Sequence, residues 1–232
     1  MIQQEPDVPY RQKSGGLSGG LSEMVELSRV ALEHATAALC DRDPPAGTCL
    51  PHAEKALYAL RQAVEDQALA IDATRVLPPA TAVRTIVVAA QVNADAEGVA
   101  ELARQLVEIA GSRPSRPTVP VEVQATVCSM GRVCVEMMAI AGGAIGSAQA
   151  DVEAGMRAAY AEMHRLRQLL YRLLLNDSGA VDVDAALDAS LAGRCYMRCA
   201  EHAVSMARHA VLAADGNPDQ HQGIRVSGQT RQ

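Results

Sequence analysis

The sequence has no phenylalanine and no tryptophan, and its aromatic residues are limited to five tyrosines among 232 residues. Strands favour aromatic and β-branched side chains, whereas Ala, Leu and Met favour helices. Here Ala, Val, Leu and Met supply most of the apolar residues, and apolar residues make up 49% of the chain. The composition therefore predicts an all-α protein with closely packed helices and a substantial core.

Basic clusters and long apolar runs are also missing. The net charge is −6, and no cluster of lysine or arginine stands out, which argues against a nucleic-acid or anionic lipid surface. Residues 1–21 lack the apolar stretch of a signal peptide, and eighteen apolar residues never follow one another without a charge. We therefore expect a soluble, cytoplasmic protein that does not insert directly into a membrane.

The chain has no C-x-x-C pair, so zinc-ribbon and thioredoxin sites lack their spacing. A chain of this length without a signal peptide does not need disulfides. We therefore expect all its cysteines to be reduced. They are Cys40, Cys49, Cys128, Cys134, Cys195 and Cys199.

Apolar periodicity predicts six helices, over residues 22–41, 51–75, 79–109, 119–148, 150–176 and 183–214. A Pro-rich linker at 113–120 divides them three and three. "RVALE" (29–33) matches "RVCVE" (132–136), and "AELA" (100–103) matches "AEHA" (200–203), in the same order and at almost one spacing. This indicates an internal duplication. We predict two tandem three-helix bundles, residues 22–114 and 115–216, between disordered segments 1–21, which includes the linker-like "SGGLSGGLS", and 217–232.

The stretch "RCYMRCAEHAVSMARHAVLAADG" (194–216) separates into three stripes on a helical wheel. The solvent stripe holds Arg194, Arg198, Glu201, Ser205 and Arg208, and the core stripe holds Tyr196, Ala200, Ala203, Val204, Ala207 and Val211. A flank holds Cys195, Cys199, His202, Met206 and His209. This flank either packs at the edge of the core, which we favour, or supplies part of a metal site with ligands from another helix.

The third predicted helix carries carboxylates on its solvent face. Glu97 and Glu101 lie one turn apart, and like charges at this spacing repel, so the pair either stays in water or holds a cation. Asp95 turns instead toward the apolar side. We expect a neighbouring helix to shield Asp95, or Asp95 to lie near the end of the bundle.

Two stretches resemble the PhoU family of phosphate-signalling proteins, whose two three-helix bundles carry an E-x-x-x-D motif in each third helix. "ADAEGVAELA" (94–103) is similar to the first motif, with Glu97 and Glu101 in the acidic positions. "GRCYMRCAEHAVSMARHAV" (193–211) is similar to the second motif, with Glu201 in place of the usual Asp. The resemblance covers about residues 22–216 and implies the same fold.

Acidic residues of these motifs hold metal clusters in the family, and this sequence departs from that pattern. Met197 stands where the second motif has its first carboxylate, and Gly98 stands where the family often has Arg. A full cluster is therefore not expected. The candidate metal-binding residues are Asp95, Glu97, Glu101 and Glu201, with one divalent or ferric ion at the first motif. We expect Arg198 and Arg208 to neutralise Glu201.

The resemblance implies a non-enzymatic adaptor that links a Pst phosphate transporter to a sensor histidine kinase, at the inner membrane face through its partners. A homodimer is possible within this class. Arg194, Arg198 and Arg208 either contact a partner or form a solvated face. The sequence shows no nucleophile–base arrangement and no phosphate-binding Gly loop.

Two alternative functions stay open. One is a divergent paralogue that keeps the bundles but has changed partners and carries no metal cluster. The other is a ferritin-like di-metal protein, which needs Glu-x-x-His on two helices. The sequence disfavours this alternative, because no glutamate lies three residues before any of His34, His52, His164, His202 or His209.

Overall fold

The computed structural model describes residues 8–40, 58–66, 80–111, 120–146, 151–176 and 182–215, and every regular element in these ranges is a helix. The predicted all-α class is confirmed. The long helices are α1 (Val8–Cys40), α3 (Ala80–Gly111), α4 (Val121–Gly146), α5 (Asp151–Asn176) and α6 (Val183–Asp215). A shorter helix covers residues 58–66. The predicted disordered tail at 217–232 lies outside the described residues.

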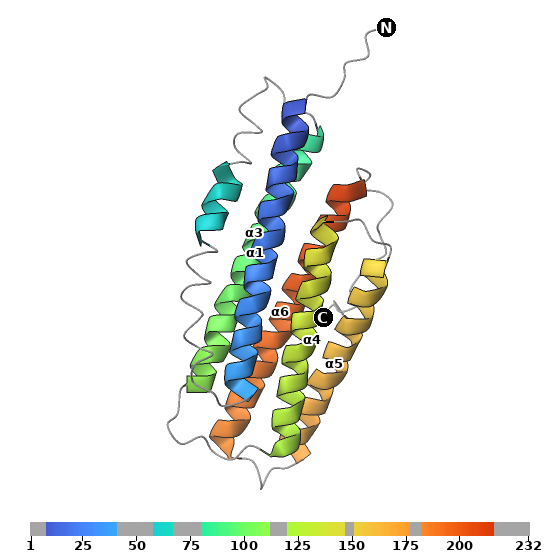
Figure 1. Cartoon of the computed structure of the whole chain (residues 1–232). Helices are drawn as coiled ribbons and strands as arrows, with labels where there is room; N and C mark the ends of the chain where they lie inside the picture. Colours follow the sequence, from blue (N-terminus) through green and yellow to red (C-terminus); the bar gives the residue numbers. More distant parts are fainter. Residues whose placement is uncertain are drawn as a thin grey trace, which may run out of the picture.

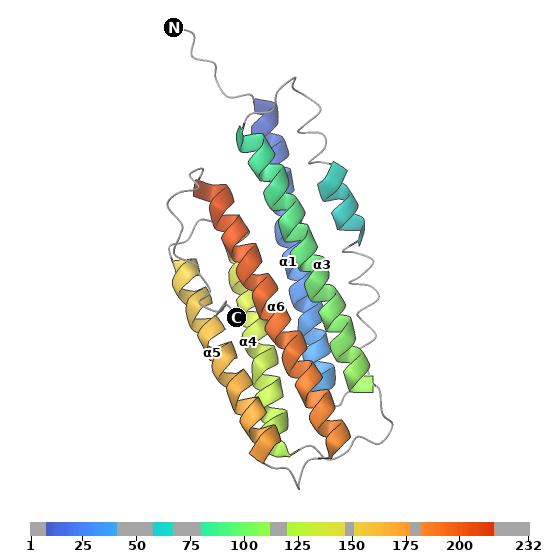
Figure 2. The same ribbon diagram turned by 180° about the vertical axis from the view of Figure 1, so that it is seen from behind.

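The first and third helices of the two halves form the middle of the molecule. α1 packs against α3 and α4, and α6 packs against the same two helices. The helix at 58–66 lies on one outer side and α5 on the other (Figure 1). Viewed from behind, α3 and α6 run side by side in opposite directions (Figure 2). The two halves therefore share one continuous apolar core.

The third helices of the two halves, α3 and α6, pack directly against each other. Across the pair formed by α3 and α6, Asp95 contacts His202, and the Cys195 thiol lies 3.7 Å from Gln105 Oε1. Ala100 and Ala200 lie between these contacts on their helices and are both buried. Small side chains at this position let the two helices approach closely.

Methionine and leucine fill most of the core, and Tyr196 is the one fully buried aromatic side chain among the described residues. The flexible thioether of methionine adapts to irregular gaps between helices. The predicted core stripe of α6 is buried from Tyr196 to Ala207, and Val211 is half-buried. The largest fully buried side chains include Tyr196, Met24, Leu32, Leu106, Met130, Met137, Met138, Met163, Leu170 and Met206.

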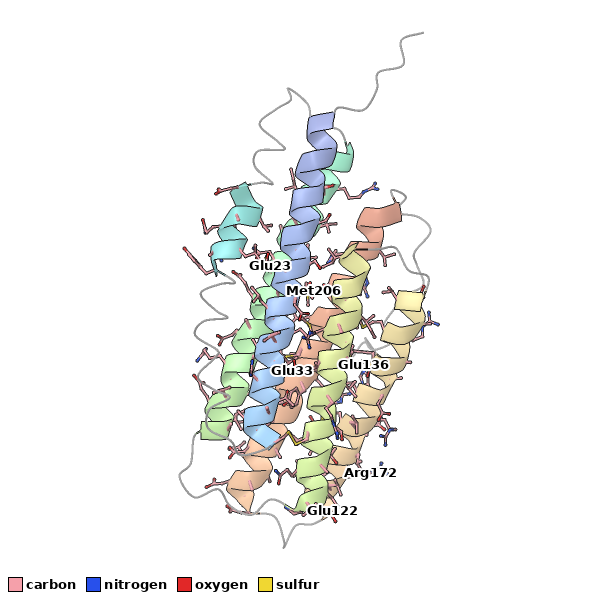
Figure 3. All side chains as sticks on the ribbon, viewed as in Figure 1. Glu23, Glu33, Glu122, Glu136, Arg172 and Met206 are labelled. Atoms are coloured by element: carbon pink, nitrogen blue, oxygen red, sulfur yellow. A yellow bond between two sulfur atoms is a disulfide. The ribbon has the colours of Figure 1, made fainter. Side chains whose placement is uncertain are left out.

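Helix α4 is apolar and long enough to cross a membrane over Val121–Ile145, the only stretch of this kind in the described ranges. A central core helix of a water-soluble protein passes the same test. Met130, Met137 and Met138 of α4 are fully buried against the other helices, and Glu136 is exposed on its outer side (Figure 3). The apolar character of α4 is accounted for by its central place in the fold.

The N-terminal segment differs from the sequence-based expectation. α1 begins at Val8, so residues 8–21, which we expected to be disordered, are helical and include the glycine-rich stretch. Leu21 is buried, and a Cβ on Gly20 would lie 3.0 Å from Val64 Cγ2. Glycine lowers helix propensity. Close packing against the helix at 58–66 outweighs that local preference.

Cysteine pairing also differs from the expectation. Cys40, the last residue of α1, forms a disulfide with Cys128 of α4, with a Cα–Cα distance of 5.8 Å (Figure 3). The two residues are 88 positions apart. Only the antiparallel packing of α1 on α4 brings them together. Among the described residues, Cys134, Cys195 and Cys199 are free and buried.

Candidate functional site

Arginine side chains engage both carboxylates of the first acidic motif. Arg61, on the helix at 58–66, donates from Nη1 to Glu97 Oε1 at 2.8 Å and also bonds Glu65. Arg104 donates two hydrogen bonds to Glu101, and these bonds lower the pKa of the Glu101 carboxyl. Both glutamates remain on the solvent side of α3. The carboxylates of this face are therefore paired with arginine side chains of the same chain.

Asp95 lies on a different side of α3 and faces α6. The Nδ1–H of His202 donates to Asp95 Oδ1 at 2.9 Å, and only 14% of the aspartate side chain is exposed. Of the two placements expected for Asp95, the structure shows shielding by a neighbouring helix. Asp95 Oδ2 is buried and has no hydrogen-bond partner among the described groups. The aspartate consequently depends on His202 for its one hydrogen bond to α6.

Gly98 explains how the imidazole can lie so close to α3. A Cβ at Gly98 would lie 2.7 Å from both Cε1 and Nε2 of His202. The absence of a side chain therefore makes room for the ring that bonds Asp95 one turn earlier. We call Asp95, Gly98 and His202 the α3–α6 clasp. The departure of Gly98 from the PhoU motif thus has a packing role in this chain.

The second acidic motif is divided between surface and core. Glu201, Arg194 and Arg198 are exposed on α6, whereas Met197 is only 5% exposed and belongs to the shared core. Met197 and Glu201 therefore do not present one exposed face, although they are four residues apart. Among the described residues no ion pair joins Glu201 to Arg198 or Arg208, the two arginines that we expected to neutralise it.

Tyr160 and His164 of α5 lie close enough to Glu201 to respond to its charge. The rings of Tyr160 and His164 meet edge to face with centroids 4.7 Å apart, and Arg167 Nη2 lies 3.2 Å from His164 Nδ1. Burial and the Arg167 charge lower the pKa of His164, against the opposing effect of Glu201. Burial and then the Glu201 charge raise the pKa of Tyr160. Together these residues form a polar surface between α5 and α6.

Sequence reasoning missed this surface and the α3–α6 clasp. The spacing of Tyr160, His164 and Arg167 puts all three on one helical face, and this signal was present in "YAEMHRLR". The bond between Asp95 and His202 had no such local signal, because 107 positions separate the two residues.

The four candidate metal-binding residues do not form one site. Asp95 faces α6, Glu97 and Glu101 are engaged by arginines, and Glu201 lies on the other half. In the ranges that the structure describes, no group of three His, Cys, Asp or Glu side chains could hold a metal ion. These residues do not fit a metal cluster. One ion at the first motif stays a prediction.

Cys195, Cys199 and Met206 of the α6 flank pack in the core, whereas His202 and His209 are half-buried. Cys195 and Cys199 are buried, and burial raises the pKa of both thiols. The Cys134 thiol of α4 donates to the Tyr196 carbonyl at 3.0 Å. A metal binds the thiolate and not the thiol. The packing interpretation of Cys195 and Cys199 therefore agrees with the structure.

The protein is a helical bundle of two duplicated halves, which share one core and each carry carboxylates on the third helix. Comparison with known proteins shows which family of helical bundles it belongs to. The chain is 31% identical over 207 residues to "Phosphate-specific transport system accessory protein PhoU homolog 2" of Mycobacterium tuberculosis, which covers 89% of this chain and 97% of that protein. It is 32% identical over 209 residues to PhoU homolog 1 of Mycobacterium leprae, covering 90% and 93%. The chain belongs to the PhoU family.

Solved structures agree on the fold. The crystal structure of PhoU from Pseudomonas aeruginosa has a TM-score of 0.78 at 19% identity and covers 90% of this chain and all of its own. The PhoU structure from Streptococcus pneumoniae has a TM-score of 0.71 at 13% identity, covering 90% and 98%. No family model matches the sequence.

Proposed function

We propose that this protein is a non-enzymatic regulator of phosphate uptake, which links a Pst-type phosphate transporter to a sensor histidine kinase. The observation that carries the proposal is the 31% identity to a phosphate-transport accessory protein over 97% of that protein's length. In this role the protein restrains the kinase when phosphate is plentiful. It works in the cytoplasm and reaches the inner membrane face through its partners.

The exposed face of α6 is our candidate for partner contact. Val183, Leu187 and Leu191 are exposed at a spacing of four residues, which places them along one helical face. Arg194 and Arg198 continue the same face toward the C-terminus. Exposed apolar side chains beside charged ones are typical of protein interaction surfaces. Partner contact on this face requires no metal ion.

A genetic experiment with a matched charge reversal tests the proposal. The host strain lacking this protein would be complemented with wild type, Arg198→Glu or Arg132→Glu, and phosphate uptake and a kinase-dependent reporter would be measured at high phosphate. Arg132 is likewise exposed but lies on α4. We expect the deletion to release the reporter, wild type and Arg132→Glu to restrain it, and Arg198→Glu to fail.

Two outcomes would count against the proposal at different levels. A deletion that changes neither phosphate uptake nor the reporter would refute the regulatory role. Equal restraint by Arg198→Glu and Arg132→Glu would leave the role intact and exclude this face of α6 as the contact. Direct binding of the purified protein to the cytoplasmic part of the kinase would separate a lost contact from lost expression.

A further inference from the structure

Cys40 and Cys128, which form the disulfide, are more exposed than the other described cysteines. Both bonded residues are half-buried, whereas Cys134, Cys195 and Cys199 are buried. We propose that Cys40 and Cys128 form a site of reversible thiol oxidation, which a thioredoxin-type dithiol opens and a two-electron oxidant closes. The state of this site controls how firmly the end of α1 is held to α4. The proposal does not depend on the role in phosphate regulation.

The bond lies where the two halves of the molecule meet. Cys40 ends α1, and Gln124 of α4 donates from Nε2 to the Cys40 carbonyl at 3.0 Å. The disulfide and this hydrogen bond both attach this end of the helix to α4. If the covalent bond opens, the hydrogen bond and the apolar packing of α1 on α4 remain.

The next turn of α1 makes a buried contact with two helices of the other half. The hydroxyl of Tyr196 donates to Thr36 Oγ1 at 3.1 Å. A Cβ on Gly131 would lie 2.4 Å from Thr36 Cγ2, so the glycine allows α1 to approach α4 at this level. The disulfide is thus one turn from the contact between α1, α4 and α6. A change at the end of α1 can therefore reach the interface between the halves.

Exchange is confined to this pair among the described cysteines. Thiolates are the reactive form in thiol–disulfide exchange. Burial raises the pKa of the Cys134, Cys195 and Cys199 thiols, and all three residues are buried. These thiols remain protonated and inaccessible to a protein reductant. Cys40 and Cys128 combine partial exposure with a bond that exchange can open.

The reaction is balanced in both directions. A thiolate of the dithiol attacks one sulfur of the bond, forms a mixed disulfide and releases the other cysteine as a thiolate, which takes up a proton. The second thiol of the reductant then displaces the remaining cysteine and becomes part of the reductant's own disulfide. For closure, a two-electron oxidant such as a diazene takes two electrons and two protons from the cysteine pair and becomes a hydrazine.

The extensive core indicates that the reduced protein stays folded. Apolar side chains from α1, α3, α4, α5 and α6 form one cluster across both halves. Disulfides are needed for folding mainly in small domains that cannot bury enough apolar surface. Opening the bond therefore changes the attachment of α1 and leaves the remaining packing in place. This property distinguishes a redox site from a structural staple.

The test begins with chemical trapping on the full chain. A Cys49→Ser variant removes the sixth cysteine as a competing partner, and the folded protein is treated either with diamide or with purified thioredoxin and its reductase. N-ethylmaleimide and peptide mass spectrometry then report the state of each cysteine. We expect diamide to link Cys40 to Cys128 and thioredoxin to make both alkylatable. Cys134, Cys195 and Cys199 should remain unmodified until the protein is unfolded.

The physical consequence is measured on the same samples. We expect reduction to lower the thermal midpoint by on the order of 10 °C, because opening a long closed loop increases the entropy of the unfolded chain. Hydrogen exchange should rise at residues 34–40 and stay unchanged at residues 24–30. The double variant Cys40→Ser/Cys128→Ser should show one midpoint with and without reductant.

Several results would overturn the proposal. Separate alkylation of Cys40 and Cys128 after diamide would show that they do not form the bond. Resistance of the bond to thioredoxin in the folded protein would show that it is no exchange site. Unfolding at room temperature on reduction would identify a structural staple. Unchanged exchange at residues 34–40 would show that the bond does not control the end of α1.

Discussion

Replacing Gly98 by alanine tests the α3–α6 clasp, because local and tertiary effects oppose each other there. In an isolated helix the change stabilises by about 1 kcal/mol, since glycine is the poorer helix former. In this protein the new Cβ would lie 2.7 Å from two atoms of the His202 ring. The ring must therefore move away and give up its 2.9 Å hydrogen bond to Asp95.

The lost bond outweighs the gain in helix propensity. A hydrogen bond to a charged group contributes about 1.5–3 kcal/mol, and Asp95 would then lack any described partner, since its Oδ2 atom has none already. We expect a net destabilisation of about 0.5–2 kcal/mol. For a chain of this size the thermal midpoint should fall by about 1–8 °C. Urea unfolding with an unchanged denaturant slope would confirm that the effect is on stability.

Two further variants make the prediction specific. Gly143→Ala in α4 is a control, because no atom of the described residues lies within 4 Å of the new Cβ there, and it should stabilise by up to about 1 kcal/mol. In a His202→Ala background, the effect of Gly98→Ala on the free energy of unfolding should reverse sign, so that the substitution stabilises the protein. If Gly98→Ala stabilises equally with and without the imidazole, the clasp does not constrain this position and our reasoning is wrong.

Three other substitutions probe the core. Ala203→Leu should destabilise by about 1–3 kcal/mol in thermal unfolding because Ala203 is fully buried, and an unchanged midpoint would place it at the surface. Met197→Glu should destabilise by at least about 2 kcal/mol because it buries a carboxylate, whereas Met197→Leu should cost less than about 1.5 kcal/mol. A stable Met197→Glu variant that binds metal tightly in calorimetry would contradict this prediction. Tyr196→Phe should cost about 1 kcal/mol through its lost hydrogen bond to Thr36, measured by urea unfolding. An equal loss in a Thr36→Val background would exclude that bond as the cause.

Arginine side chains pair with the carboxylates on the acidic face of the first half in this structure. Glu97 is bonded to Arg61 from another helix, and Glu101 to Arg104 from its own. Exposed ion pairs of this kind each contribute about 0–1 kcal/mol. They neutralise the carboxylates without fixing the face strongly. The arginines thus account for the charge of this acidic face within the chain itself, and one ion at the first motif stays a prediction.

The sequence by itself determined the helical class, the repeated halves and the buried face of α6. These features follow from the spacing of apolar residues along each helix, which is a local property. The same wheel placed Asp95 on the apolar side of α3, and the structure buries it there. The PhoU motifs were likewise contiguous in the chain and could be recognised before any contact was known.

Only the tertiary structure decided which side chains meet. Three contacts join residues of different helices: the His202 ring lies against Gly98, Arg61 forms an ion pair with Glu97, and Cys40 forms a disulfide with Cys128. Apolar periodicity specifies the face that a helix buries, but not its neighbour, the level of contact or the polar pairs at the edge. The core position of Met197 was decided in the same way, because its burial depends on how closely the neighbouring helices pack against α6.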